Sequence, residues 1–447
     1  MDDDINYASI VEANVYLREQ FAGVLQKIDI GYQFTYAQTW LNGQNGPISI
    51  SLPSTIIFHY SVELFPFFDN LIPEGWLLSY VQDIHRIDKG NRFALLMATG
   101  RYPIGAVSVI PLKDGKELHK SIPLMSSKQC TTEKLIFPKS SGICSYCLEE
   151  IDSRKDFHGK CIRQLWGTSR QLKMFLDPKE PLEVFRHTIY GASISGAQRK
   201  GLFQLKKGEL QPSQGNEALF ILKPPGTFSS LPENEHVTMC IAKKIGFDVP
   251  AIGLFKVPQI GNIFVIRRFD NHASNQWKRM EDFGQVLGYS SENKYTGTYN
   301  KIAKGIENYS DAALVDIVEF WKRLLFAFFI GNGDMHLKNW ALLEQDDLHG
   351  RFRLSPCYDL LNTRLPLPKE QFELALPMDA RQNKVNRKRF LEFAETLNIL
   401  PFAEQVLKEE LLNWMTVTKI FVHRSFLSEE QKEEYINIVE QRFQRLL

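Results

Sequence analysis

A short polar segment follows a strongly apolar stretch of the chain. Residues 331–339 read "GNGDMHLKN" directly after "WKRLLFAFFI" at 321–330. Asp334 offers a carboxylate that can accept a proton from a hydroxyl group, and the amide oxygen of Asn339 can bind Mg²⁺. The plainer interpretation is a capped helix end, at which Gly331 and Asn332 terminate the apolar helix. The segment by itself is compatible with both interpretations.

The spacing of Asp334 and Asn339, with four residues between them, is that of the catalytic loop of protein kinases. A kinase also needs a second carboxylate on a separate turn downstream, because the Mg²⁺ that bridges the phosphates requires an anionic ligand. Asp359 in "SPCYDLLNT" follows Asn339 by twenty residues, after the strand-like "RFRL". The three residues together favour phosphoryl transfer.

Residues that would hold a nucleotide occur upstream in the expected order. Small and hydroxyl side chains in "YGASISGAQRKGLFQL" would let backbone N–H groups approach phosphates, and they include Ser193, Ser195 and Gly196. Lys223 ends the apolar strand "ALFIL", where a lysine would contact ATP, and Glu235 in the first turn of the next helix is its candidate ion-pair partner. The alternatives are that the serines form a turn in which their hydroxyls bond the backbone, that Lys223 is an exposed lysine at a strand end, and that Glu235 interacts only with the helix dipole.

Three of the six cysteines lie close together in "CSYCLEEIDSRKDFHGKC". With one histidine they form the pattern C-x2-C-x10-H-x2-C, made by Cys144, Cys147, His158 and Cys161. Three thiolates and one imidazole suit a tetrahedral structural Zn²⁺ whose four protein ligands close the site. We therefore expect a zinc site that stabilises folding, and the alternative is a reduced, metal-free cluster.

Other polar residues near these motifs have simpler explanations. We expect His336 to be a packed or hydrogen-bonded loop residue rather than an acid–base group. A structural ion-pair network is expected for Arg267, Arg268 and Asp270. Glu281 and Asp282 are likewise expected to be structural.

The elements that position these residues form a strand-rich half followed by a helical half. Residues 10–112 alternate strand-like runs with turns and contain one helix-like segment, "FFDNLIPEGWLLSYVQDI". Strand patterns return from 191 in "LFQLKK", "ALFILKP" and "NIFVIRRF", and from about 278 the apolar spacing is mainly helical. At 447 residues with 44% hydrophobic residues, the chain is expected to fold into two or three domains of an α+β protein.

The charge and hydropathy of the chain indicate which kinds of partner it can bind. The chain has 53 Lys and Arg against 52 Asp and Glu, a net charge of +1, so no basic surplus exists to bind nucleic acid directly. The start "MDDDINYASI" is acidic and polar, and no apolar stretch has the length of a membrane span. We expect a cytoplasmic protein without a membrane partner.

The motifs together resemble those of the HipA-like serine/threonine kinases, toxin components of bacterial toxin–antitoxin systems. The resemblance is carried by "SISGAQRK" (193–200), "LFILKP" (219–224), "VIRRFD" (265–270), "EDFGQVLG" (281–288), "GNGDMHLKN" (331–339) and "SPCYDLLNT" (355–363). The segments "FFDNLIPEG" and "FALLMATGRYPIGAVSVIP" resemble the small N-terminal subdomain of the family, which some members make as a separate chain, the HipS-like form. The cysteine segment is similar to an insertion in some longer relatives.

The resemblance implies a bilobal kinase-like core with a mostly helical C-terminal lobe. The implied division is a HipS-like subdomain (1–112), a linker (113–143), the cysteine-rich zinc segment with connecting helices (144–190), a kinase N-lobe (191–278) and a helical C-lobe (279–447). Asp334 would be the catalytic base, Lys338 would steady the transferring phosphate, and Asn339 and Asp359 would bind Mg²⁺. ATP would contact Lys223, Glu235 and the loop with Ser193, Ser195 and Gly196.

The family also implies regulation and partners. Ser193 or Ser195 would be autophosphorylated, and the added charge would eject the loop and end ATP binding. The implied substrate is an aminoacyl-tRNA synthetase, and the implied partner is a HipB-like helix-turn-helix antitoxin that supplies the DNA contact. Two alternatives stay open: a kinase of this type acting on another host or phage protein, and a non-catalytic kinase-like binding module. The sequence leaves open whether the N-terminal subdomain inhibits the kinase and what the oligomeric state is.

Overall fold

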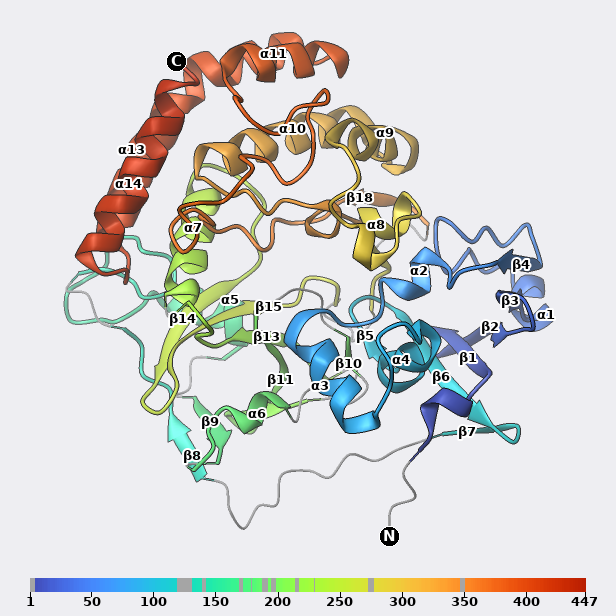
Figure 1. The fold of residues 1–447 in the computed structure, drawn as a ribbon. Helices are drawn as coiled ribbons and strands as arrows, with labels where there is room; N and C mark the ends of the chain where they lie inside the picture. The colour runs from blue at the N-terminus through green and yellow to red at the C-terminus, as the bar shows by residue number, and fades with distance from the viewer. Residues whose placement is uncertain are drawn as a thin grey trace.

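The structure is a computed structural model that describes residues 5–118, 131–138, 142–168, 172–177, 179–186, 192–193, 198–213, 217–228, 230–271, 277–345 and 350–447. Figure 1 shows the chain from the N-terminus in blue to the C-terminus in red. The N-terminal part of the chain forms one sheet with helices on it, a second, larger sheet follows, and the last part is mainly helical.

The N-terminal part contains a six-stranded sheet in the order β4-β3-β2-β1-β6-β7. Its strands are β1 (Glu12–Leu17), β2 (Gln20–Lys27), β3 (Tyr32–Tyr36), β4 (Phe58–Ser61), β6 (Val107–Lys113) and β7 (Lys116–Glu117). The turn between β1 and β2 has only two residues, Arg18 and Glu19, both with positive φ, as tight hairpin turns require. Strand β1 alternates half-buried and buried residues, so one face of the sheet packs on a core.

Short helices cover that face of the sheet. They are η1 (Tyr7–Ser9), α1 (Gln38–Asn42), α2 (Pro66–Asp69), α3 (Gly75–His85) and α4 (Arg92–Thr99). Phe34, Phe68 and Phe93 lie at the centre of a hydrophobic cluster that also takes in Trp277 from the second part of the chain. The segment expected to be one helix from 67 is two helices, α2 and α3, because "NLIPE" interrupts it, and α4 precedes β6 where mainly strand was expected.

The second sheet has seven strands in the order β14-β15-β13-β11-β12-β9-β8. They are β8 (Thr131–Lys134), β9 (Lys173–Leu176), β11 (Gly201–Lys206), β12 (Glu209–Pro212), β13 (Phe220–Lys223), β14 (Ile252–Val257) and β15 (Gly261–Arg267). β10 (Ala192–Ser193) pairs in parallel with β5 (Tyr102–Pro103) of the N-terminal part. The helices α5 (Gly159–Trp166), α6 (Glu183–Arg186) and α7 (Leu231–Lys244) accompany the sheet, and α7 packs on β14 and β15.

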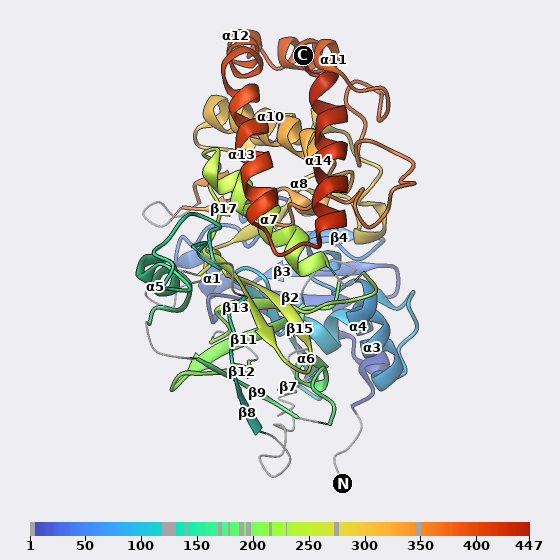
Figure 2. The same cartoon turned by 90° about the vertical axis from the view of Figure 1, so that its left-hand side faces the viewer.

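The last part of the chain combines a small sheet with helices. The sheet has the order β16-β17-β18, from Met280–Asp282, Ala341–Glu344 and Phe352–Leu354. The helices are α8 (Phe283–Val286), η2 (Ser291–Asn293), α9 (Tyr299–Tyr309), α10 (Ala313–Phe329), η3 (Leu337–Asn339), α11 (Arg387–Thr396), α12 (Leu400–Gln405), the π-helical turn η4 (Val406–Glu410), α13 (Leu411–Arg424) and α14 (Glu429–Gln444). Figure 2 shows α13 and α14 side by side, with α7 between them and the seven-stranded sheet.

The mixed fold of helices and sheets expected from the sequence is confirmed, but two details differ. The segment 113–143 was expected to be a linker, yet its described residues include β7 and β8, and β8 is an edge strand of the second sheet. β9 likewise comes from the cysteine-rich segment. Both strands are only four residues long, which is too short for an alternating pattern to be recognised in the sequence.

Among the residues that the structure describes, no helix combines the length and the apolar character needed to cross a bilayer.

Candidate active site

The polar segment at 331–339 begins where α10 ends. The last residues of α10, from Phe326 to Phe329, are fully buried, and Gly331 follows with a φ of 78°. Asn332 N donates to Ala327 O at 2.8 Å and Gly331 N donates to Phe328 O at 3.1 Å, the paired bonds of a Schellman cap. The helix-end interpretation of this segment is therefore right in its geometry. This geometry is compatible with a chemical role of the segment, because the cap fixes the position at which the following loop begins.

Asp334 and Asn339 are held together by the backbone of this loop. Asn339 Nδ2 donates to the carbonyl oxygen of Asp334 at 2.7 Å, which leaves the amide oxygen of Asn339 for another ligand. Tyr295 Oη donates to Asp334 Oδ1 at 2.7 Å. Burial raises the pKa of Asp334 above its usual value, although the Tyr295 hydrogen bond opposes the shift. A raised pKa makes this carboxylate a better proton acceptor.

Asn332 connects the Asp334 loop to the Asp359 turn. Its Oδ1 accepts from Asp334 N at 3.0 Å, and its Nδ2 donates to Asp359 O at 3.4 Å. Asp359 itself has a φ of 54°, in the left-handed region where Asp is among the few tolerated residues. The two carboxylates predicted from the sequence are thus presented by neighbouring turns.

Lys223 at the end of β13 lies between two carboxylates. Its Nζ is 2.6 Å from Glu235 Oε1 on α7 and 2.5 Å from Asp359 Oδ1. Burial disfavours the Lys223 ammonium, but the carboxylates of Asp359 and Glu235 outweigh it and raise the pKa of Lys223. Burial also opposes ionisation of Asp359, yet the Lys223 and Lys200 charges hold its pKa well below the usual range. Burial raises the pKa of Glu235 to about 7.

These contacts settle two alternatives. Lys223 is 5% exposed, so the interpretation as an exposed strand-end lysine is wrong. Glu235 is the fifth residue of α7 rather than a first-turn residue, and its partner is Lys223 instead of the helix dipole. The helix begins at Leu231, with Pro232 as its second residue, so Glu235 lies just beyond the first turn.

A pocket connects the Lys223 cluster to the loop at 331–339. Its charged and amide lining includes Lys200, Lys223, Arg268, Asp282, Lys338, Asn339 and Asp359, and its apolar lining includes Ile221, Ile266 and Tyr358. Asn70, Leu71, Pro103 and Ile104 of the N-terminal part complete one wall. The pocket thus combines apolar residues with lysines and a candidate metal-binding pair, the groups that the base and the phosphates of a nucleotide would need.

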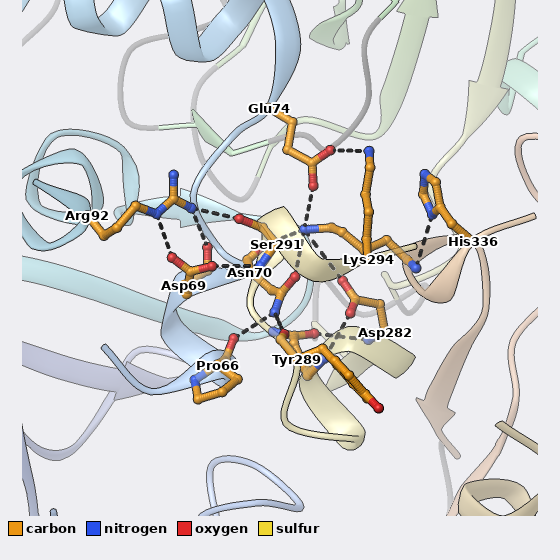
Figure 3. A network of polar contacts seen from close by, with 12 residues as sticks. Pro66, Asp69, Asn70, Glu74, Arg92, Asp282, Tyr289, Ser291, Lys294 and His336 are labelled. Atoms are coloured by element: carbon orange, nitrogen blue, oxygen red, sulfur yellow. Dashed lines mark hydrogen bonds and ion pairs between the residues drawn. The ribbon is translucent and has the colours of Figure 1, made fainter. Parts of the chain in front are cut away.

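Lys338 faces the N-terminal part of the molecule. Its Nζ lies 3.0 Å from Glu74 Oε1 and 3.8 Å from Asp282 Oδ2, and it donates to Asn70 Oδ1 at 3.0 Å. Glu74 also pairs with Lys294 at 2.6 Å, as Figure 3 shows. Burial opposes ionisation of Glu74, but the Lys338 and Lys294 charges outweigh it and lower its pKa to about 2. The phosphate role expected for Lys338 stays a prediction.

The same interface contains further polar contacts. Arg92 donates to Asp69 Oδ1 at 2.6 Å and to Ser291 Oγ at 2.8 Å, and Ser291 N donates to Asp69 Oδ2 at 2.8 Å. Asn70 Nδ2 donates to both Pro66 O and Tyr289 O, each at 2.8 Å (Figure 3). The N-terminal part is therefore fixed to the segment 282–294 beside the candidate catalytic loop.

The residues expected to be structural have contacts that fit that role. His336 is buried, its Nδ1 accepts from Lys338 N at 3.2 Å, and burial lowers its pKa to about 3, so its ring is neutral near pH 7. Arg268 pairs with Asp270 at 2.6 Å. Asp282 caps α8, and Glu281 accepts from Ser49 Oγ at 2.7 Å. Arg267 donates to Leu165 O at 3.2 Å rather than to a carboxylate, so it lies outside the expected ion-pair network.

The predicted phosphate loop is described only in part. Ser193 ends β10, which pairs with Pro103 of β5, and its backbone position is all that the structure describes. Ser195 and Gly196 lie outside the described residues. The nucleotide and autophosphorylation roles of all three stay predictions.

Cys144, Cys147, His158 and Cys161, called here the Cys₃His site, come together as expected from their spacing. Their ligand atoms all lie within 4.8 Å of one another. His158 Nε2 donates to Glu150 O at 3.1 Å, and His158 Nδ1 faces Cys147 Sγ at 3.5 Å. A carbonyl that fixes the tautomer of a ligand histidine is the usual support of a metal site. The donor set and its geometry fit Zn²⁺.

Four polar residues beside these sites were not found from the sequence. They are Asn70, Glu74, Tyr295 and Asn332. Lys200 was seen only as part of a motif, yet it is buried in the pocket, and burial lowers its pKa to about 8. Asn332 lies inside the motif at 331–339, and Asn70 and Glu74 lie inside the segment "FFDNLIPEG", but neither segment indicates which contacts these side chains make.

Comparison with known proteins identifies the family. The family model described as the HipA-like C-terminal domain matches residues 192–419, and that of the HipA N-terminal domain matches residues 13–110. The first covers more than half of the 447 residues, so the chain belongs to the HipA family. The family resemblance expected from the motifs is thereby confirmed.

Individual relatives agree with this assignment. The chain is 29% identical over 352 residues to "Putative kinase Y4dM" of Sinorhizobium fredii, covering 74% of this chain and 71% of that relative. It is 34% identical over 206 residues to a "Putative kinase" of Haemophilus influenzae, covering 43% of this chain and 59% of the relative. The HipA solved with HipB and operator DNA from Shewanella oneidensis has a similar fold, with a TM-score of 0.66 at 19% identity over 97% of this chain and 96% of that one.

Proposed function

We propose that the chain is an ATP- and Mg²⁺-dependent serine/threonine protein kinase of the HipA type with a bilobal core. The observation that carries the proposal is the meeting of Lys223, Asp359 and Asn339 at one pocket, next to the Asp334 carboxylate. The family membership and the relatives named as kinases support the same class of reaction.

Each of these residues has a separate role in the proposed phosphoryl transfer. Asp334 accepts the proton of the attacking hydroxyl group, and its raised pKa suits this task. The amide oxygen of Asn339 and the carboxylate of Asp359 would hold Mg²⁺, which neutralises charge on the phosphate oxygens when it is bound. Lys223, held by Glu235, contacts the phosphates, and Lys200 adds a second positive charge at the same end of the pocket. Lys338 steadies the transferring phosphate.

Regulation by autophosphorylation belongs to the same proposal. Ser193 or Ser195 takes the phosphate, and two added negative charges in a loop that must approach ATP end nucleotide binding. The Cys₃His site holds a structural Zn²⁺.

The substrate is an aminoacyl-tRNA synthetase, whose phosphorylation arrests translation, and the partner is a HipB-like helix-turn-helix protein. The complex of the Shewanella oneidensis relative with HipB and operator DNA supports that partner. The near-neutral charge of this chain fits a DNA contact made by the partner.

Incubation of the purified chain with Mg²⁺-ATP and a cell lysate, followed by phosphopeptide mass spectrometry, tests this proposal. We expect phosphoserine or phosphothreonine on a synthetase and on a serine of the 193–195 segment. If the new phosphate is found on another protein instead, that protein and not a synthetase is the substrate. Absence of any new phosphopeptide relative to the Asp334→Asn variant would favour a non-catalytic binding module.

A further inference from the structure

Two neighbouring residues of α7 contact two segments that form the candidate nucleotide site. Glu235 binds Lys223 at 2.6 Å. Asn234 Nδ2 donates to Asn362 O at 2.8 Å, and Asn234 Oδ1 accepts from Asn362 N at 2.9 Å. Both α7 side chains are about 1% exposed. The position of this turn of α7 therefore determines where the lysine and the segment after Asp359 lie.

The next residue of α7, His236, contacts the Cys₃His site. Its Nε2 donates to the carbonyl oxygen of Tyr146 at 2.9 Å, and Tyr146 lies in the turn between Cys144 and Cys147. One turn further along α7, the Cys240 thiol donates to the same carbonyl at 3.5 Å. Because this carbonyl belongs to the turn between two ligand cysteines, its position depends on the conformation that the ligands impose.

The Tyr146 side chain fixes the other side of this turn to the seven-stranded sheet. Trp166 Nε1 donates to Tyr146 Oη at 2.7 Å. A Cβ on Gly253 of β14 would lie 2.7 Å from the Tyr146 ring, so the ring lies directly on that strand. Leu148, by contrast, packs into the hydrophobic cluster of the helical part. The turn is therefore wedged between the sheet and α7.

Charged residues just after the turn add contacts to two helices. Glu149 pairs with Lys244 at the end of α7 at 2.6 Å. Arg424 at the end of α13 pairs with Glu150 and donates to Leu148 O at 3.5 Å. These pairs are partly exposed and contribute little energy individually. They show that the segment 148–150 is held against α7 and α13 as well as against the sheet.

We propose that the Cys₃His site, loaded with Zn²⁺, positions α7 and thereby the Lys223–Glu235 pair. The link between the Cys₃His site and α7 rests on the contacts alone. Its consequence for nucleotide binding rests on the proposed function. Zn²⁺ ties its four ligands to one another, so the turn that carries Cys144 and Cys147 is held more firmly in this conformation while the ion is bound. Loss of the ion releases the Tyr146 carbonyl, and α7 loses its hydrogen bond at the residue next to Glu235.

The test compares Cys161→Ser, which removes one ligand, with His158→Cys, a matched variant that keeps four metal-binding side chains. Zinc content, hydrogen exchange along the chain and the Kd for Mg²⁺-ATP are measured on each full-length protein. We expect Cys161→Ser to lose zinc, to exchange faster over Leu231–Lys244 and to bind ATP on the order of tenfold more weakly. His158→Cys should retain zinc and resemble the wild type.

Unchanged exchange in β1 to β3 shows that the variant is still folded, and chelation of zinc from the wild-type protein provides a second route to the same state. Zinc loss without faster exchange in α7 would overturn the proposal, as would a wild-type protein that binds no zinc. If α7 exchanges faster but no form of the protein binds ATP, the link between the Cys₃His site and α7 is supported. The proposed kinase function is then contradicted.

Discussion

Two buried lysines at the candidate active site are neutralised in different ways. Lys223 is held by Glu235 and Asp359, which both belong to the second half of the chain. Lys338 is held mainly by Glu74 and Asn70, which belong to the N-terminal part. The first cluster lies within the core of the fold, at the candidate nucleotide site. The second shows that the N-terminal part reaches the candidate catalytic loop, so the two parts of the chain build one site.

Replacement of the candidate base should have the largest effect on the reaction. We expect Asp334→Asn to slow phosphoryl transfer by about 10²- to 10⁴-fold, because general-base catalysis contributes that much, while ATP affinity is retained. The measurement is a single-turnover transfer assay alongside calorimetric ATP binding. The control is Asp311→Asn, which changes an exposed carboxylate paired with Arg351. Equal transfer rates for the two variants would show that the base is a different group.

Removal of the Lys223 charge breaks the first cluster. Lys223→Met leaves Glu235 and Asp359 without their ammonium partner, and we expect a loss of about 3–5 kcal/mol in the free energy of unfolding together with loss of ATP binding. Denaturant unfolding measures the first effect. Lys256→Met, at the one exposed position of β14, is the control and should change stability by less than about 0.5 kcal/mol. A Lys223 variant as stable as the control would mean that the cluster is not paired in solution.

Removal of the Glu74 charge tests the second cluster. Glu74→Gln weakens its contacts to Lys338 and Lys294, and we expect a loss of about 2 kcal/mol at pH 7. The folded-state pKa of Glu74 is lowered to about 2, so its contribution is present above pH 4.5 and is lost as the pH falls from 4.5 towards 2. The difference in unfolding free energy between variant and wild type should shrink over that interval.

Glu292 provides the matched control for this second cluster. It also pairs with a lysine of the N-terminal part, Lys89, at 3.3 Å, but both side chains are about 60% exposed. Glu292→Gln should therefore leave stability nearly unchanged. If the Glu74 and Glu292 variants behave alike, the N-terminal part is not fixed to the catalytic loop in the way described.

The smallest effect is expected at His336. Burial lowers its pKa to about 3, so it does not titrate near neutral pH and the pH dependence of transfer should not come from it. His336→Asn retains a side-chain acceptor for Lys338 N, and the shape of the rate profile between about pH 6 and pH 8 should be the same. Disappearance of an inflection in that range would assign His336 an acid–base role.

Local patterns in the sequence were enough for part of this site. Asp334 with Asn339, Lys223 with Glu235 and the Cys₃His site were predictable because each depends on short spacings or on one strand followed by one helix. The Lys338 cluster was not, since Asn70 and Lys338 are 268 residues apart in the sequence and neither has a pattern that indicates the other. β8 and β9 were missed for a similar reason, because their place at the sheet edge comes from tertiary pairing.

As a kinase, the chain would transfer the terminal phosphate of ATP to a hydroxyl group. The most direct test incubates the purified chain with Mg²⁺, a lysate and ATP that is labelled at either the γ-phosphate or the α-phosphate, and then measures the label on protein. We expect the γ label to appear on serine or threonine in a Mg²⁺-dependent reaction that is strongly slowed in Asp334→Asn. Label transferred only from the α-phosphate, or no transfer from either position, would contradict this prediction.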